Sequence, residues 1–64
     1  MFNYRLLNLD GTPAANPTFA SSEPNWRVGD RVMIRPGVEY RIVGIKAAPD
    51  VHGVWFVEPV PNGH

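Results

Sequence analysis

The sequence predicts an all-β fold, namely a small antiparallel barrel or roll of five strands. Seven prolines and six glycines are spread along the 64 residues, and they interrupt every apolar pattern with a helical period. Short runs of β-branched and aromatic residues lie between these turn residues, which is typical of small β-barrels and sandwiches. A chain of this length has room for one hydrophobic core, so we expect residues 1–64 to form a single domain.

The first expected strand covers residues 2–9. Phe2, Tyr4 and Leu6 share one face because side chains alternate along a strand, and polar side chains separate them. An Asp-Gly pair follows directly and is a strong signal for a hairpin turn. The chain is therefore expected to reverse after this strand.

Residues 12–25 are expected to form a long proline-rich loop, because they contain three prolines and mostly small polar side chains. A short edge strand around residues 18–20 is the regular structure that this stretch could contain. Phe19 is its one large apolar side chain and must be buried somewhere. We therefore favour a loop that covers apolar surface over a mobile binding loop, since proline lowers the entropy cost of ordering such a segment.

The run at residues 31–35 alternates clearly, with Val32 and Ile34 directed inwards. The Pro-Gly pair at 36–37 predicts a type II turn, because proline presets the first central dihedral and glycine accepts the positive φ of the second. A hairpin is therefore expected here.

The next strand covers residues 38–45, and its apolar face changes along its length. Tyr40 and Ile42 share one face, whereas Ile45 falls on the other if the strand is regular. Glycine inside a strand often marks a bulge. We therefore expect a bulge at Gly44 that bends the strand and returns Ile45 to the core side.

A second loop at 46–53 precedes a run of four apolar residues, Val-Trp-Phe-Val, at 54–57. Adjacent side chains lie on opposite sides of a strand, so Trp55 and its neighbour Phe56 cannot both face one core. One of them is expected outside, together with Met33 and Trp26. These apolar side chains either lie under the loop at 12–25 or form a contact surface, and Trp55, Trp26 and Met33 are the candidate partner-binding residues.

Charge and cysteine content exclude several classes of protein. Six basic and six acidic side chains balance, so no overall field attracts nucleic acid or an anionic membrane. The chain has no cysteine, which excludes disulfides and thiolate metal sites and favours the cytoplasm. The sequence shows no secretory leader and no apolar run long enough to span a membrane. We expect a mature soluble protein.

Catalytic and metal-binding residues are scarce. His52 lies in an expected turn, and His64 is the last residue of the sequence. Asp50 and His52 supply two metal ligands at most, fewer than the three or four that a zinc site needs. No glycine-rich phosphate-binding motif occurs. We therefore expect no enzyme, no metal and no cofactor.

Three arginines form a second candidate surface. Arg31 and Arg35 project from one face of their strand, and Arg41 projects from the same side of the antiparallel neighbour. Guanidinium groups at such spacing bind phosphates or carboxylates. The simpler interpretation, which we favour, is a solvated face that prevents an exposed sheet from pairing with others.

The segment WRVGDRVMIRPGVEYRIVGI, residues 26–45, resembles the core of SH3-like small barrels. Through residues 29–32, Gly-Asp-Arg-Val, and Gly37 it is also similar to the KOW-type motif of ribosomal and transcription-associated proteins. These resemblances imply an SH3-like barrel, and the second implies nucleic-acid binding. The overall pattern also resembles small uncharacterised bacterial proteins, which implies no activity.

The sequence thus favours a non-catalytic binding or assembly module that contacts a protein partner, or a second copy of itself, through exposed aromatic and apolar side chains. The alternative is a KOW-like nucleic-acid-binding module that uses the arginine face.

Overall fold

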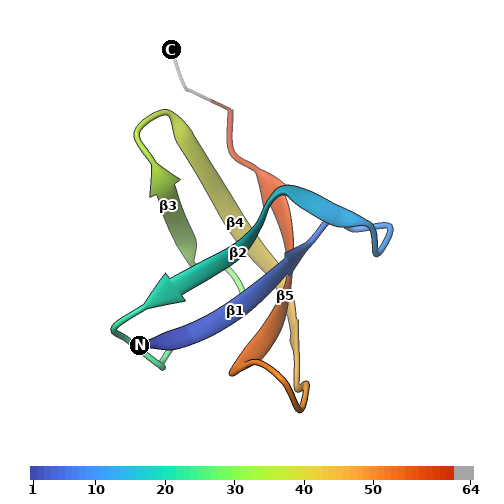
Figure 1. Ribbon diagram of the computed structural model, residues 1–64. Helices are drawn as coiled ribbons and strands as arrows, with labels where there is room; N and C mark the ends of the chain where they lie inside the picture. Colours follow the sequence, from blue (N-terminus) through green and yellow to red (C-terminus); the bar gives the residue numbers. More distant parts are fainter. Residues whose placement is uncertain (62–64) are drawn as a thin grey trace.

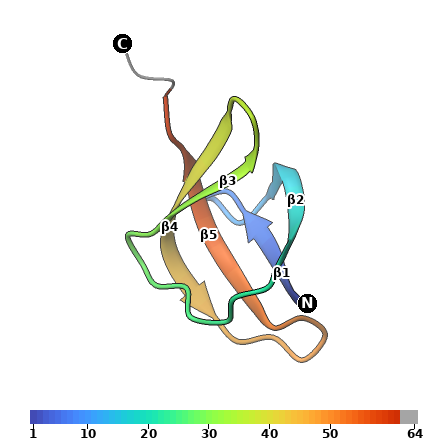
Figure 2. The ribbon, with the colours of Figure 1, turned by 90° about the vertical axis from the view of Figure 1, so that its left-hand side faces the viewer.

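The computed structural model describes residues 1–61 of the chain. They form one sheet of five strands, β1 (Phe2–Leu7), β2 (Pro13–Ser21), β3 (Arg31–Arg35), β4 (Val38–Lys46) and β5 (Gly53–Pro59). The order across the sheet is β2-β1-β5-β4-β3, and the sheet curls into a half-barrel with the two outer hairpins on either side of β5 (Figure 1, Figure 2). The all-β prediction is confirmed. Within residues 1–61 there is no helix, and so none that could cross a membrane.

The centre of the sheet departs from the expected arrangement. Three of the four strand pairs are antiparallel, but β1 and β5 run parallel, so the prediction of a wholly antiparallel sheet is wrong there. The direction of β5 is set by its hairpin with β4, and β1 meets it from the other side. The apolar pattern of a strand indicates which face is buried but not which distant strand lies beside it.

Strand β2 occupies most of the stretch that was expected to be a loop. Residues 13–21 pair with β1, and the loop is confined to 22–30. The sheet tolerates Pro13 and Pro17 because β2 is an edge strand, where a missing N–H is not needed by a neighbour. The pairing is irregular, since Arg5 lies opposite Thr18 whereas Leu7 lies opposite Pro13. The expected strand at 18–20 is part of β2.

The core lies on the concave side of the curled sheet. Its largest fully buried side chains are Trp55, Leu6, Ile42 and Val57. On β5, Trp55 and Val57 face this core, and the half-buried Phe56 lies on the convex side. The two adjacent rings therefore point to opposite sides, as the sequence predicted, and Trp55 is the inner one.

The predicted bulge in β4 is confirmed. Ile42 pairs with Val57, but Gly44 already pairs with Phe56, so one extra residue is inserted into β4 between them. Ile45 then lies opposite Trp55, although 43% of its surface remains exposed. The bulge bends β4 around the end of the core, which places Ile45 at the rim of a groove at that end of the half-barrel.

Candidate functional site: an aromatic groove

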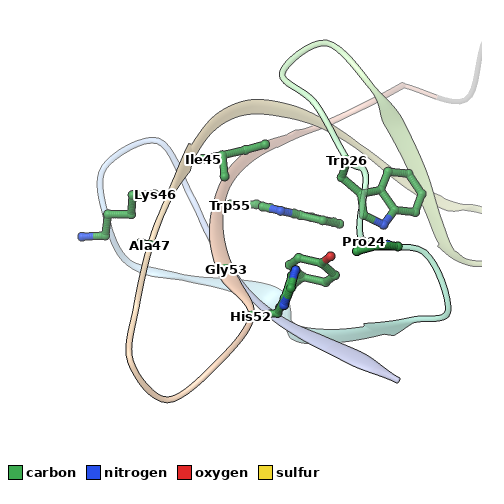
Figure 3. Close-up of a pocket in the computed structure, with 9 residues that line it drawn as sticks. Pro24, Trp26, Ile45, Lys46, Ala47, His52, Gly53 and Trp55 are labelled. Atoms are coloured by element: carbon green, nitrogen blue, oxygen red, sulfur yellow. The ribbon is translucent and has the colours of Figure 1, made fainter.

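A groove of about 290 Å³ opens at the end of the half-barrel where β4 ends and β5 begins (Figure 3). Its walls come from β1, the loop at 22–30, the end of β4 and the start of β5 with its preceding loop. The lining residues are Tyr4, Pro24, Trp26, Ile45, Lys46, Ala47, His52, Gly53 and Trp55. Segments that are far apart in the sequence thus meet around one concave, largely aromatic surface.

Aromatic rings form the floor and one wall of the groove. The rings of Tyr4 and Trp55 are stacked, with centroids 4.2 Å apart and an interplanar angle of 26°. The half-buried Trp26 lies beside this stack, its centroid 5.4 Å from that of Trp55 and tilted by 60°. Such offset and tilted arrangements are the favoured geometries of aromatic pairs. Trp55, 1% exposed, is the floor, and Trp26 presents the accessible ring.

Hydrogen bonds hold the Trp26 wall in place. The indole Nε1–H donates to Ser21 Oγ (3.1 Å), and the Glu23 N–H donates to the same oxygen (3.0 Å). The Tyr4 hydroxyl donates to the Glu23 carbonyl (3.3 Å), and burial raises the pKa of this phenol. The donors of both rings are therefore satisfied inside the protein, and the partly exposed Trp26 is the ring that remains accessible in the groove.

The Gly-Asp pair before β3 anchors the other end of the same loop. The Arg27 N–H donates to Asp30 Oδ2 (2.9 Å), and the Asp30 N–H donates back to the Arg27 carbonyl (3.0 Å). Gly29 has a φ of +98°, which favours glycine, and its N–H donates to the Ile42 carbonyl (2.8 Å). This motif is thus a turn that fixes the loop to β4, and the loop in turn positions Trp26.

The opposite rim is formed by the loop between β4 and β5. The His52 N–H donates to the Asn3 carbonyl (2.8 Å), and the His52 ring packs on Phe2 with centroids 4.7 Å apart. An ion pair between Asp50 and Arg5 ties the loop to β1, and the Arg5 guanidinium lowers the pKa of the Asp50 carboxyl. Both rims of the groove are therefore attached to the sheet.

The lining carries little charge. None of the nine lining residues is acidic. The Lys46 ammonium points away from Trp55 and His52 (Figure 3), and it lies 5.8 Å from the centroid of the Phe56 ring on the convex face. Because neither a carboxylate nor the ammonium faces the groove, its shape and chemistry suit an uncharged apolar group.

The structure separates the three residues that were expected to form one exposed contact surface. Trp26 and Trp55 do come together, in the groove, and of the two adjacent rings Trp55 and Phe56 it is Trp55 that is buried in the core. Met33 is 62% exposed and lies on β3, outside the groove lining. The residue on the outside of β5 is Phe56.

Sequence patterns missed several groove residues. Tyr4 was placed on one face of its strand with Phe2 and Leu6, but nothing in that strand indicated that its ring would stack on Trp55. Pro24 and His52 lie in loops, where no periodicity reports the direction of a side chain. The one indication in the sequence was its high content of aromatic residues, because a chain of this length can bury only a small core.

The arginine face exists, but it is partly neutralised. Arg31 lies opposite Arg41 in the β3–β4 pair, and Arg41 forms an ion pair with Glu58 of β5. Arg35 lies at the end of the hairpin and is exposed. Glu39 lies opposite Met33, so three guanidiniums share the β3–β4–β5 surface with two carboxylates. A shallow depression of about 140 Å³ lies between Arg31, Arg41 and Glu58.

Groups suited to metal binding do not converge in residues 1–61. No three side chains of His, Cys, Asp or Glu in this part of the chain come close enough to hold a metal ion. His52 is exposed at the groove rim and Asp50 is paired with Arg5. His64 lies outside the described residues.

Comparison of the chain with family models, curated proteins and solved structures finds no match. The resemblance to SH3-like and KOW-type modules therefore stays a prediction.

Proposed function

We propose that the protein is a non-catalytic binding module whose aromatic groove holds an extended, proline-containing segment of a partner protein. The observation that carries this proposal is the packing of Tyr4, Trp26 and Trp55 around one open groove. Aromatic-lined grooves bind proline-rich segments because the extended polyproline conformation is already formed before binding and loses little entropy.

The chemistry of the lining supports a neutral apolar ligand. The ring donors of Tyr4 and Trp26 already have partners in the protein, and Tyr4 and Trp55 are buried, so a ligand gains its aromatic contact from the partly exposed ring of Trp26. The exposed Ile45 and Pro24 extend this apolar surface at the rim. A cavity of about 290 Å³ is at the lower end of the range for small-molecule sites, so it accommodates a few residues of a peptide.

Such a site is expected to bind weakly. Two of its three aromatic side chains are buried, so a ligand gains little apolar contact in the groove. The cost of ordering the ligand offsets part of that gain. Weak binding of this kind is typical of a transient contact.

Tryptophan fluorescence tests the proposal directly, because the two tryptophans of the chain both line the groove. Titration with peptides from a proline-rich library should produce a saturable change in emission for at least one sequence. Trp26→Ala should abolish binding of that peptide. Leu9→Ala, which also removes an exposed apolar side chain but far from the groove lining, should leave its affinity unchanged. A library without binders, or equal binding by the Trp26 variant, would refute the proposal.

The alternative function, nucleic-acid binding through Arg31, Arg35 and Arg41, has weaker support. The ion pair between Arg41 and Glu58 already uses one guanidinium, and the chain carries no net charge. Binding of a DNA or RNA oligonucleotide that falls steeply with salt and is lost in Arg31→Ala would favour this function, because phosphate contacts release counterions. Apolar binding in the groove should respond little to salt.

We also propose that the fold is an SH3-like barrel and that the protein acts in the cytoplasm. Five curled strands with an aromatic groove between loops support the first proposal. The absence of cysteine supports the second.

A further inference from the structure

Strands β2 and β3 are the two edges of the sheet, and they differ in how well they are protected. Strand β2 contains Pro13 and Pro17, which lack the N–H groups that an added strand would need. Strand β3 has the sequence Arg-Val-Met-Ile-Arg without proline, and its pairing with β4 is regular from Arg31 to Met33 before the register shifts between Met33 and Arg35. In residues 1–61, β3 therefore presents the edge that is chemically able to accept another strand.

The hydrogen-bond pattern identifies the groups on this edge. The Ile42 N–H donates to the Asp30 carbonyl (2.9 Å) and the Ile42 carbonyl accepts from the Gly29 N–H (2.8 Å), so Ile42 directs both of its backbone groups towards the β3 side. Hydrogen-bonded pairs alternate along such a ladder, and the next one on β3 is Val32. The N–H and C=O groups of Arg31 and Met33 consequently point away from β4, towards the open edge.

A hydrogen bond on the β5 side of β4 supports the conclusion that the Met33 backbone groups point towards the open edge. Met33 lies opposite Glu39 in the β3–β4 pair. The Glu39 carbonyl accepts from the Val60 N–H (2.9 Å), so it points towards the β5 side and not towards Met33. The backbone of Met33 is thus not engaged by β4.

The side chains of β3 determine which kind of strand can pair with its open edge. Arg31 and Arg35 are exposed at the two ends of β3. If a second copy paired antiparallel about Met33, each Arg31 would lie opposite the Arg35 of the other copy, and like charges directly opposite are destabilising. Acidic side chains at the same positions of a partner strand would instead form cross-strand ion pairs.

The concave side adds an apolar requirement. Ile34 is only half-buried at the edge of the core, and Val38 is likewise partly exposed. An added strand would direct every second side chain to this side of the sheet. Apolar residues at those positions would extend the core over Ile34.

We infer that the free edge of β3 binds an extended segment of another protein in which acidic and apolar residues alternate. The added segment bonds to the backbone of Arg31 and Met33, pairs its carboxylates with Arg31 and Arg35, and packs its apolar side chains beside Ile34. This surface is separate from the aromatic groove, and neither site depends on the other.

Amide hydrogen exchange followed by NMR tests the edge itself. In the free protein the amides of Arg31 and Met33 should exchange rapidly while that of Val32 is protected. A short peptide that alternates glutamate and valine should slow exchange at Arg31 and Met33 by about tenfold or more at saturation. The same peptide with lysine in place of glutamate should have no such effect.

Variants with reversed charge test whether Arg31 and Arg35 determine which peptide binds to β3. The double variant Arg31→Glu, Arg35→Glu should bind the glutamate peptide about tenfold more weakly and gain affinity for the lysine peptide. Arg27→Glu, a single charge reversal at an exposed arginine outside β3, should bind the glutamate peptide like the parent chain, whereas Arg31→Glu alone should weaken that binding. Circular dichroism confirms that each variant is folded.

Three results would overturn the inference. They are protection of Arg31 and Met33 in the free protein equal to that of Val32, equal binding of the glutamate and lysine peptides, and protection that appears at β2 or around Trp26 instead of β3. The last result would assign the peptide to another surface of the same chain.

Discussion

Substitution of Gly44 by valine would test the close packing that the β4 bulge creates on the convex face. A Cβ atom at Gly44 would lie 3.3 Å from Cδ2 and 3.6 Å from Cβ of Phe56, and the first distance is tighter than ordinary van der Waals contact. Gly44 does not have a positive φ, so the cost is steric and does not come from backbone strain. Overpacking of this kind typically costs 1–3 kcal/mol.

The half-buried Phe56 can shift part of the way, so we expect Gly44→Val to lower the free energy of unfolding by about 1–2 kcal/mol. For a chain of this size the corresponding decrease in Tm is about 4–16 °C. Thermal and urea unfolding followed by circular dichroism measures both quantities. Gly44→Ala should have a clearly smaller effect, because alanine adds the Cβ atom without the two methyl groups.

A double-mutant cycle identifies the cause. Phe56→Ala removes the ring that a valine would meet, together with its contact to the Lys46 ammonium. In that background Gly44→Val should cost less than half of what it costs in the parent chain. An equal cost in both backgrounds, or an unchanged Tm for the single variant, would refute the packing argument.

Three further variants test the core, the ion pair and the β3–β4 turn. Trp55→Ala should cost about 3–5 kcal/mol, comparable to the whole stability of so small a domain, and a cooperative native-like unfolding transition at 25 °C would contradict the central role of this ring. Arg5 lowers the pKa of Asp50, so this pair stabilises the fold above pH 3.8, and the stabilisation is lost as the pH falls below that value towards the lower folded-state pKa. In Asp50→Asn, the free energy of unfolding measured in urea should therefore decrease less steeply with falling pH over this range. The same pH dependence in the variant and the parent chain would exclude a contribution from the pair. Gly37, with a φ of +85°, should lose about 1–2 kcal/mol on substitution by valine, whereas an unchanged Tm would show that the turn relaxes at no cost.

Local patterns predicted the strands whose buried faces repeat every second residue. The inward faces of Tyr4 and Leu6, and of Val32, follow directly from alternation, and the bulge at Gly44 follows from the point where alternation fails. These features depend on residues close together in the sequence, so single-strand reasoning was sufficient for them.

Features that depend on long-range pairing could not be predicted in the same way. The prolines of residues 13–21 suggested a loop because proline cannot donate a hydrogen bond, yet an edge strand does not need every donor. Whether Trp55 or Phe56 faces the core is decided by the register of β5 against both of its neighbours. The groove depends on both the extent of β2 and the register of β5, because it forms where the loop after β2 crosses the stacked rings of Tyr4 and Trp55.

The central position of β5 has a consequence for how the chain folds. Strands β1 and β2, and strands β3 and β4, each form a hairpin, but in residues 1–61 the sheet connects these two hairpins only through β5. An isolated hairpin is marginally stable in water, so neither half is expected to persist alone. Folding therefore requires the last strand in the sequence to insert beside the first, a contact of high sequence separation that slows the reaction compared with a simple meander. Removal of residues 53–61 should thus leave an unfolded chain, and a synthetic peptide of those residues should restore the fold when it is added back.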